Sequence, residues 1–165
     1  MGVNNRIHPT AIIYSDVIIG DNCYIGPYCI IGAPPEWKGR EEQGNGVVIG
    51  NNVMIHGHVT IDAGAIAPTY VGDNCYIMKG VHIGHDCNIN KNCTLSPHCI
   101  LGGTVTIGNA TNVGMGAIIH QGVTIPLGCM IGMGAIVTKR TVMQGYGVYC
   151  GNPAKFLRNN THEKD

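Results

Sequence analysis

The hydrophobic positions of this chain repeat with a period of six residues. From Val71 to Val137 an aliphatic residue occupies every sixth position without an exception. An α-helix repeats about every 3.6 residues and an amphipathic strand every two residues, so neither element produces this spacing. The positions are Val71, Ile77, Ile83, Ile89, Leu95, Leu101, Ile107, Val113, Ile119, Ile125, Ile131 and Val137.

Two shorter runs with the same period precede this stretch. They are Ile7, Ile13, Ile19, Ile25, Ile31 and then Ile49, Ile55, Ile61, which brings the total to 20 hexads. Hexads of this kind are typical of a parallel β-helix, in which each hexad forms one short strand. With about three strands per coil, the sequence predicts an all-β fold, a parallel β-helix of six to seven coils over residues 1–145.

Two breaks in the pattern predict loops. Residues 33–46 contain the only Trp and two prolines, and we expect an excursion loop there. Residues 62–70 shift the register by four positions and predict a second, smaller loop. Long loops in compact domains are often functional. Residues 146–165 predict a C-terminal extension, with a short helical tail over residues 153–159.

Seven of the eight cysteines share one place in the hexad, two residues before the aliphatic position. Elsewhere small residues such as Ala11, Val17 and Thr111 fill this place. We therefore expect a small inward-facing core position, with reduced cysteines that act as small hydrophobic residues. The seven are Cys23, Cys29, Cys75, Cys87, Cys93, Cys99 and Cys129.

The composition excludes several classes of protein. The formal net charge is zero and 12% of the residues are charged, without a basic run that would favour nucleic acid. No apolar run approaches the ~18 residues of a transmembrane helix, and the N-terminus lacks the pattern of a signal peptide. We expect a cytoplasmic protein without membrane insertion. Flat prisms with open ends tend to self-associate, so we expect a homotrimer by analogy with the fold.

The spacing of the histidines predicts a site on one outer face. His85 lies two residues after Ile83, outside both inward places, and Gly103 follows 18 residues later, one coil further on. Their backbones should lie ~5 Å apart, and we expect His82 and His120 on the same face. A neutral histidine can accept a proton at physiological pH, and a glycine amide can stabilise an oxyanion. These residues are therefore candidates for acid–base catalysis.

The residues around these histidines resemble a known family. The segments that carry the resemblance are 81–87 (Val-His-Ile-Gly-His-Asp-Cys), His120–Gln121, 34–38 (Pro-Pro-Glu-Trp-Lys) and 59–64 (Val-Thr-Ile-Asp-Ala-Gly). The chain resembles the UDP-N-acetylglucosamine acyltransferases, trimeric left-handed β-helix enzymes of lipid A synthesis, a part of lipopolysaccharide biosynthesis.

The resemblance implies roles for individual residues. His85 would be the general base, Asp86 its support and Gly103 the donor to the oxyanion. The implied substrate-binding residues are His82, His120, Gln121, Glu36, Lys38 and Asp62. The family has a histidine where this chain has Asp62, and another where it has Thr104.

A second resemblance concerns the C-terminal part. Gly151, Asn152, Pro153 and Lys155 are similar to the ending of acetyl-CoA-dependent hexapeptide acetyltransferases, where this segment lies near the pantetheine arm. By the first resemblance, Met133 matches a chain-length position at which a bulky Met favours shorter acyl groups. The helical C-terminal domain of the first family has no counterpart in the sequence given. We therefore expect transfer of an acetyl group from acetyl-CoA to an amine or hydroxyl of a nucleotide-linked sugar, with no metal.

Three alternatives remain at this point. The first is an O-acyltransferase of the lipid A type that takes a short or medium acyl chain from acyl carrier protein. The second is a γ-type carbonic anhydrase, which holds zinc with three histidines, but this chain lacks the His-x4-His pair of that family. The third is a scaffold subunit without catalytic activity, in which His85 has no role.

Overall fold

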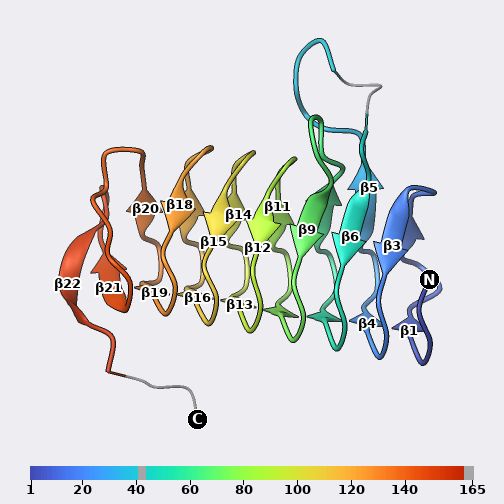
Figure 1. The fold of residues 1–165 in the computed structure, drawn as a ribbon, viewed down its shortest axis with the longest axis horizontal. Coiled ribbons are helices and arrows are strands. Elements are labelled where there is room, and N and C mark those ends of the chain that lie inside the picture. The colour runs from blue at the N-terminus through green and yellow to red at the C-terminus, as the bar shows by residue number, and fades with distance from the viewer. Residues whose placement is uncertain (41–43, 162–165) are drawn as a thin grey trace.

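The computed structural model describes residues 1–40 and 44–161 and shows a solenoid of short parallel strands (Figure 1). All 20 of the predicted aliphatic hexad positions lie in strands β1 to β20, one in each strand. The strands are β1 (Arg6–Ile7), β2 (Ile12–Ile13), β3 (Val17–Ile19), β4 (Tyr24–Ile25), β5 (Ile30–Ala33), β6 (Val47–Ile49), β7 (Met54–Ile55), β8 (Thr60–Asp62), β9 (Thr69–Val71), β10 (Tyr76–Ile77), β11 (His82–Ile83), β12 (Asn88–Ile89), β13 (Thr94–Leu95), β14 (Ile100–Leu101), β15 (Thr106–Ile107), β16 (Asn112–Val113), β17 (Ile118–Ile119), β18 (Thr124–Ile125), β19 (Met130–Ile131), β20 (Ile136–Val137), β21 (Gly147–Cys150) and β22 (Lys155–Asn159).

Every third strand joins the same sheet, so the strands form the three faces of a prism. The first sheet contains nine strands from β1 to β22, the second seven strands from β2 to β20, and the third six strands from β3 to β18. In the uninterrupted part, each residue pairs with the residue 18 positions later, as Ile83 does with Leu101. β21 continues the first sheet beyond the hexads, so about eight coils form, more than the six to seven expected from the hexads alone.

The interior of the prism is filled by the two inward places of each hexad. From Ile19 onward every aliphatic hexad residue is buried, and the seven hexad cysteines are exposed by 2% or less. All eight cysteines are free thiols, as predicted for the seven in the hexad place. Several thiols donate to a carbonyl oxygen of the neighbouring coil, for example Cys87 Sγ to Gly102 O at 3.1 Å. Cysteine is thus a small core residue that also satisfies a backbone acceptor.

The prediction of a helical tail is wrong. Lys155–Asn159 form strand β22, which pairs antiparallel with β21 and caps the C-terminal end of the first sheet (Figure 1). The side chain of Phe156 packs edge-on against the buried ring of Tyr149, with 5.8 Å between the ring centroids. This cross-strand contact favours a strand at a place where the sequence offers no hexad to indicate one. Residues 162–165 of the expected extension lie outside the described residues.

The two loops between coils project from the same side of the solenoid and are bonded to each other (Figure 1). The Asn45 amide donates to Gly64 O at 2.7 Å, and the Gly64 amide donates to Gly46 O at 3.1 Å. Arg40 adds a side-chain contact from Nη1 to Ala65 O at 3.4 Å. The two breaks in the hexad pattern therefore form one connected feature. Within the described residues, no helix has the length and apolar character needed to cross a bilayer.

Candidate active site

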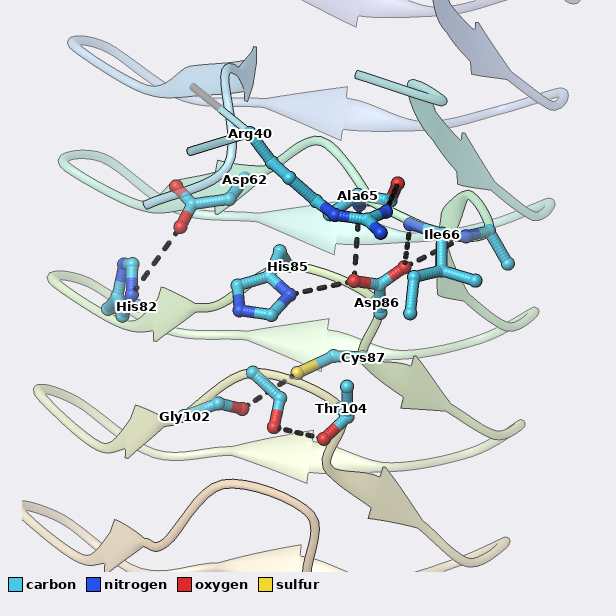
Figure 2. Close-up of polar contacts among 12 residues, drawn as sticks. Arg40, Asp62, Ala65, Ile66, His82, His85, Asp86, Cys87, Gly102 and Thr104 are labelled. Atoms are coloured by element: carbon cyan, nitrogen blue, oxygen red, sulfur yellow. Dashed lines mark hydrogen bonds and ion pairs between the residues drawn. The ribbon is translucent and has the colours of Figure 1, made fainter. Parts of the chain in front are cut away.

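His85 and Asp86 are in direct contact on the turn that follows β11. His85 Nδ1 lies 2.7 Å from Asp86 Oδ2, and the two side chains are only 15% and 8% exposed (Figure 2). Asp86 has a φ of 57°, a left-handed conformation that aspartate tolerates better than most residues. In a regular strand the two side chains would point to opposite faces. The turn instead brings them to the same side, which the sequence alone left unexplained.

Three backbone amides of the second loop fix the carboxylate of Asp86. Ile66 N and Ala67 N donate to Oδ1 at 2.7 and 2.8 Å, and Ala65 N donates to Oδ2 at 3.1 Å (Figure 2). Burial alone would raise the pKa of Asp86, but the hydrogen bonds from Ala67, His85, Ile66 and Ala65 outweigh it and hold the pKa below its usual value. Asp86 therefore remains a carboxylate, and His85 Nδ1 is the donor in their hydrogen bond. The lone pair of His85 Nε2 is then free to accept a proton.

The excursion loop covers the other side of His85. The ring of Trp37 lies 5.1 Å from the His85 ring, measured between centroids, with 35° between the planes. The guanidinium of Arg40 lies over the Trp37 ring, 5.0 Å from the ring centroid. The loop therefore limits the access of water to His85 and gives the imidazole an apolar neighbour.

A cavity of about 340 Å³ opens beside His85. The residues that line it are Glu36, Trp37, Lys38, His85, Gly103, Thr104 and Gln121. Gly103 lies one coil from His85, as the spacing predicts, and a Cβ at Gly103 would collide with the Nε2 edge of the imidazole. Among the hydrogen bonds of the described residues, none has the Gly103 N–H as donor. This amide is therefore available beside the proton acceptor.

Asp62 and His82 form a second carboxylate–imidazole pair on the other side of His85. Asp62 Oδ2 lies 3.9 Å from His82 Nε2 (Figure 2). On the other side of the ring, His82 Nδ1 lies 2.8 Å from Thr60 Oγ1. Asp62 is 6% exposed, and burial raises the pKa of its carboxyl group. Electrostatic interactions with His82 and His85 oppose that rise, and the interaction with Glu36 adds to it. Neither residue of the pair lines the cavity of 340 Å³. Asp62 nevertheless interacts electrostatically with His85 and Glu36, which do line it.

His120 is not part of the His85 cavity, contrary to the expected cluster of three histidines. His120 Nδ1 lies 2.9 Å from Gln121 O, and the ring lines a second cavity of about 680 Å³. His120, Thr138, Lys139, Arg140, Thr141, Val142, Pro153, Ala154, Lys155 and Phe156 line this cavity. Since Gln121 lines the first cavity and His120 the second, the two cavities meet at adjacent residues.

The expected donor-binding residues are only partly brought together. Pro153 and Lys155 line the second cavity, whereas Gly151 and Asn152 are exposed and outside its lining. Met133 is 71% exposed on the turn between β19 and β20, outside both cavities. Sequence reasoning missed the basic pair Lys139–Arg140, although its position directly after the last hexad is a visible signal. Among the described residues, no three His, Cys, Asp or Glu side chains gather in a way that could hold a metal ion.

Two family models match the chain. The model for bacterial transferase hexapeptide (six repeats) matches residues 2–33 and 68–103, and the model for the hexapeptide repeat of succinyl-transferase matches residues 104–139. Together they cover most of the strands of the solenoid.

Curated relatives and solved structures that resemble this chain include UDP-N-acetylglucosamine acyltransferases. An acyl-(acyl-carrier-protein)–UDP-N-acetylglucosamine O-acyltransferase from Rickettsia canadensis is 30% identical over 49% of this chain and 46% of that protein. The structure of a UDP-N-acetylglucosamine acyltransferase from Campylobacter jejuni has a TM-score of 0.90 at 34% identity, over 96% of this chain and 62% of that chain. The chain thus spans about half the length of the curated relatives that it matches.

A perosamine N-acetyltransferase from Caulobacter crescentus, in complex with CoA and GDP-perosamine, is more distant. Its TM-score is 0.65 at 24% identity, over 94% of this chain and 57% of that chain. At this identity the likeness extends to the fold alone.

Proposed function

We propose that this chain, which matches the hexapeptide-repeat models, transfers an acyl group from a thioester to a nucleotide-linked sugar. The premise is its resemblance to the UDP-N-acetylglucosamine acyltransferases. The observation that carries the proposal is the His85–Asp86 pair, whose free imidazole edge faces Gly103 in a cavity. This combination places a proton acceptor and a hydrogen-bond donor for an oxyanion on neighbouring coils.

The proposed reaction is a direct transfer. His85 Nε2 takes a proton from the amine or hydroxyl of the sugar while that atom attacks the thioester carbonyl. The carbonyl oxygen becomes an oxyanion that accepts a hydrogen bond from the Gly103 N–H. The C–S bond then breaks, the thiolate leaves, and the proton on His85 passes to it. Asp86 stays ionised and stabilises the imidazolium that exists between the two proton transfers.

No covalent intermediate on the protein is needed. Cys87 lies next to Asp86 in sequence, but its thiol points into the core and is 1% exposed. Burial raises the pKa of Cys87 to about 12, so the thiol stays protonated and is a poor nucleophile at neutral pH.

The residues around His85 suit a polar acceptor with a phosphate group. Glu36 and Gln121 offer acceptors and donors for sugar hydroxyl groups, and Lys38 offers a cation for a diphosphate. Trp37 provides a flat apolar surface at the mouth, beside which a sugar ring can pack. The elements that depart from the hexad pattern thus supply most of the acceptor contacts.

The second cavity supports acetyl-CoA as the donor. Lys139, Arg140 and Lys155 bring three cations to it, which suits the phosphates of CoA, while Val142 and Phe156 give it an apolar wall for the pantetheine arm. Gly151, Asn152 and Met133 would contact the arm or the acyl group further along. The second candidate donor is acyl carrier protein, which the names of the relatives favour.

A homotrimer is the proposed assembly, with the second sheet as the subunit interface. The outward column of this sheet contains five isoleucines, which pair in register with Thr60 and His82 in the middle. They are Ile12, Ile30, Ile100, Ile118 and Ile136. An apolar column of this kind is unusual on an exposed sheet face and is typical of an interface. Because His82 is part of the column, a neighbouring subunit would complete the wall of the site.

Calorimetry separates the two donors. We expect the purified protein to bind acetyl-CoA, and the double substitution Lys139→Ala, Arg140→Ala to weaken that binding by about 10- to 100-fold through the loss of charge-assisted contacts. Lys79→Ala, which removes an exposed cation from another turn, is the matched control. Binding of short acyl carrier protein alone would favour the second donor. Binding of neither, together with no transfer, would refute the proposal.

A further inference from the structure

The Asp62–His82 pair is a second acid–base unit that the reaction above does not use. Asp62 stands at the end of β8 and His82 at the start of β11, in neighbouring coils of the second sheet. Figure 2 shows the His85 ring between Asp86 on one side and the Asp62–His82 pair on the other. The site thus contains two carboxylate–imidazole pairs. His85 and Asp86 are in hydrogen-bond contact at 2.7 Å, whereas His82 and Asp62 are 3.9 Å apart.

The carboxylate of Asp62 lacks the partners that Asp86 has. Its side chain is 9% exposed, and within the described part of the chain no hydrogen bond reaches it. Three backbone amides and an imidazole compensate Asp86, whereas Asp62 faces only His82 at 3.9 Å, His85 further away, and the like charge of Glu36. A buried carboxylate without donors is costly, and a bound cation with N–H groups removes that cost. The geometry therefore favours a cationic hydrogen-bond donor at this place.

His82 is oriented to take a proton there. When Nδ1 carries the proton and donates to Thr60 Oγ1, the lone pair of Nε2 faces the Asp62 carboxylate. A group that lies between the two residues therefore meets the carboxylate of Asp62 and the proton-accepting Nε2 of His82.

The number of protons distinguishes the two classes of acceptor. A sugar hydroxyl loses one proton when it becomes an ester, and His85 alone can receive it. A primary amine is an ammonium ion near neutral pH and loses two protons when it becomes an amide, one before the attack and one after it. An amine that binds as ammonium must therefore lose two protons within the site, and a second base near the first can take one of them.

We infer that the acceptor is a primary amine of a nucleotide-linked sugar, held as ammonium by the Asp62 carboxylate and converted to the free amine by His82. The step balances: one N–H bond of the ammonium breaks, one N–H bond forms at His82 Nε2, and the proton then passes to solvent. The free amine attacks the thioester carbonyl, and His85 takes the second proton and gives it to the leaving thiolate. This inference rests on the proposed function and adds the chemical class of its acceptor.

The test uses matched acceptors and matched variants. UDP-N-acetylglucosamine is compared with analogues in which an amino group replaces the hydroxyl at carbon 3, 4 or 6, using acetyl-CoA and short acyl carrier protein as donors. The variants are Asp62→Asn, which removes the charge and keeps the shape, Asp62→His, and His82→Gln. Asp16→Asn, which changes an exposed aspartate on the turn before β3, is the control.

We expect the wild-type protein to acylate one amino analogue at least about 10-fold faster than UDP-N-acetylglucosamine. Asp62→Asn should lower kcat/KM for the amine by about 10- to 100-fold, mainly through KM, and reduce the preference for amine over hydroxyl. In His82→Gln, kcat/KM should rise with pH more steeply than in the wild type, by about tenfold per unit below the pKa of the amine, because only the free amine reacts.

Other results would overturn the inference. Faster transfer to the hydroxyl, or an Asp62→Asn variant that loses both acceptors equally, would show that Asp62 has only a structural role. An unchanged pH profile in His82→Gln would remove His82 as the first base. Transfer to no acceptor from either donor would instead refute the proposed function itself.

Discussion

At the scale of residues, the contact between His85 and Asp86 depends on one left-handed turn. The positive φ of Asp86 turns its carboxylate back toward the imidazole and, at the same time, toward three amides of the second loop. The same side chain thus orients the imidazole of His85 and anchors a loop. Loss of its charge should therefore change both catalysis and stability.

Replacing Asp86 with asparagine tests this double role. We expect Asp86→Asn to lower kcat by about 100-fold or more, because the imidazolium loses its counter-charge and His85 its preferred tautomer. Because the pKa of Asp86 is lowered on folding, the ionised carboxylate stabilises the fold fully above its ordinary value of 3.8, and this contribution is lost as the pH falls through the lowered pKa.

The stability difference between wild type and Asp86→Asn should therefore shrink as the pH falls below about 4. Urea unfolding at several pH values measures this difference. A constant difference down to pH 2 would contradict the assignment of the lowered pKa to Asp86.

Gly103 provides a second residue-scale prediction. A Cβ at this position would meet the Nε2 edge of His85, so Gly103→Ala should displace the imidazole and reduce kcat by at least about 10-fold while the solenoid remains folded. Gly116→Ala places a methyl group in open space at another turn, where φ is 64° and some strain is expected, and so controls for backbone effects. Equal activity losses in the two variants would show that strain, and not the His85 contact, is responsible.

At the scale of elements, the inward cysteines should be protected by the coils. Burial raises the pKa values of Cys87 and Cys99 to about 12, and only Cys150 lies outside the fully buried set. We expect one of the eight thiols to react rapidly with a thiol reagent at pH 7–8, and seven only after unfolding. Mass spectrometry of the modified protein identifies the reactive site. Rapid modification of Cys87 in the folded protein would contradict its place in the core.

The repeated strands could be predicted from sequence, whereas the site could be predicted only in part. The hexads determine the places of the 20 short strands because each aliphatic residue must enter the same core. They also place Gly103 beside His85, one coil apart. Beyond the last hexad, only tertiary contacts decide the structure, and β22 forms there by pairing with β21 instead of the expected helix.

Side chains outside the core are not determined by the hexad register. His120 shares the outer face with His85, but its ring turns to the second cavity. The contact of Trp37 with His85 depends on how two loops bond to each other, which no period in the sequence encodes. Residues of the solenoid could thus be placed by counting, and residues of the loops could not.

At the scale of the whole molecule, the isoleucine column of the second sheet should hold the subunits together. Ile100 and Ile118 are 42% and 40% exposed in the single chain, which is high for residues of this type. We expect Ile118→Asp to dissociate the proposed trimer, because a carboxylate buried at its interface would lack a partner. Thr124→Asp, on the outward side of the third sheet, should leave the mass unchanged in light scattering. A monomeric wild-type protein, or an intact trimer in Ile118→Asp, would contradict the interface.

We propose above that this protein transfers an acyl group with His85 as the proton acceptor. The most direct measurement compares the rate of acyl transfer to UDP-linked sugars, with acetyl-CoA and acyl carrier protein as donors, in the wild type, His85→Ala and His8→Ala. We expect His85→Ala to keep the fold and mass of the wild type and to lose at least about 1,000-fold in rate. His8→Ala, which removes an exposed imidazole from the first coil, should keep the wild-type rate. Undiminished transfer by His85→Ala would contradict the role of His85 as the proton acceptor.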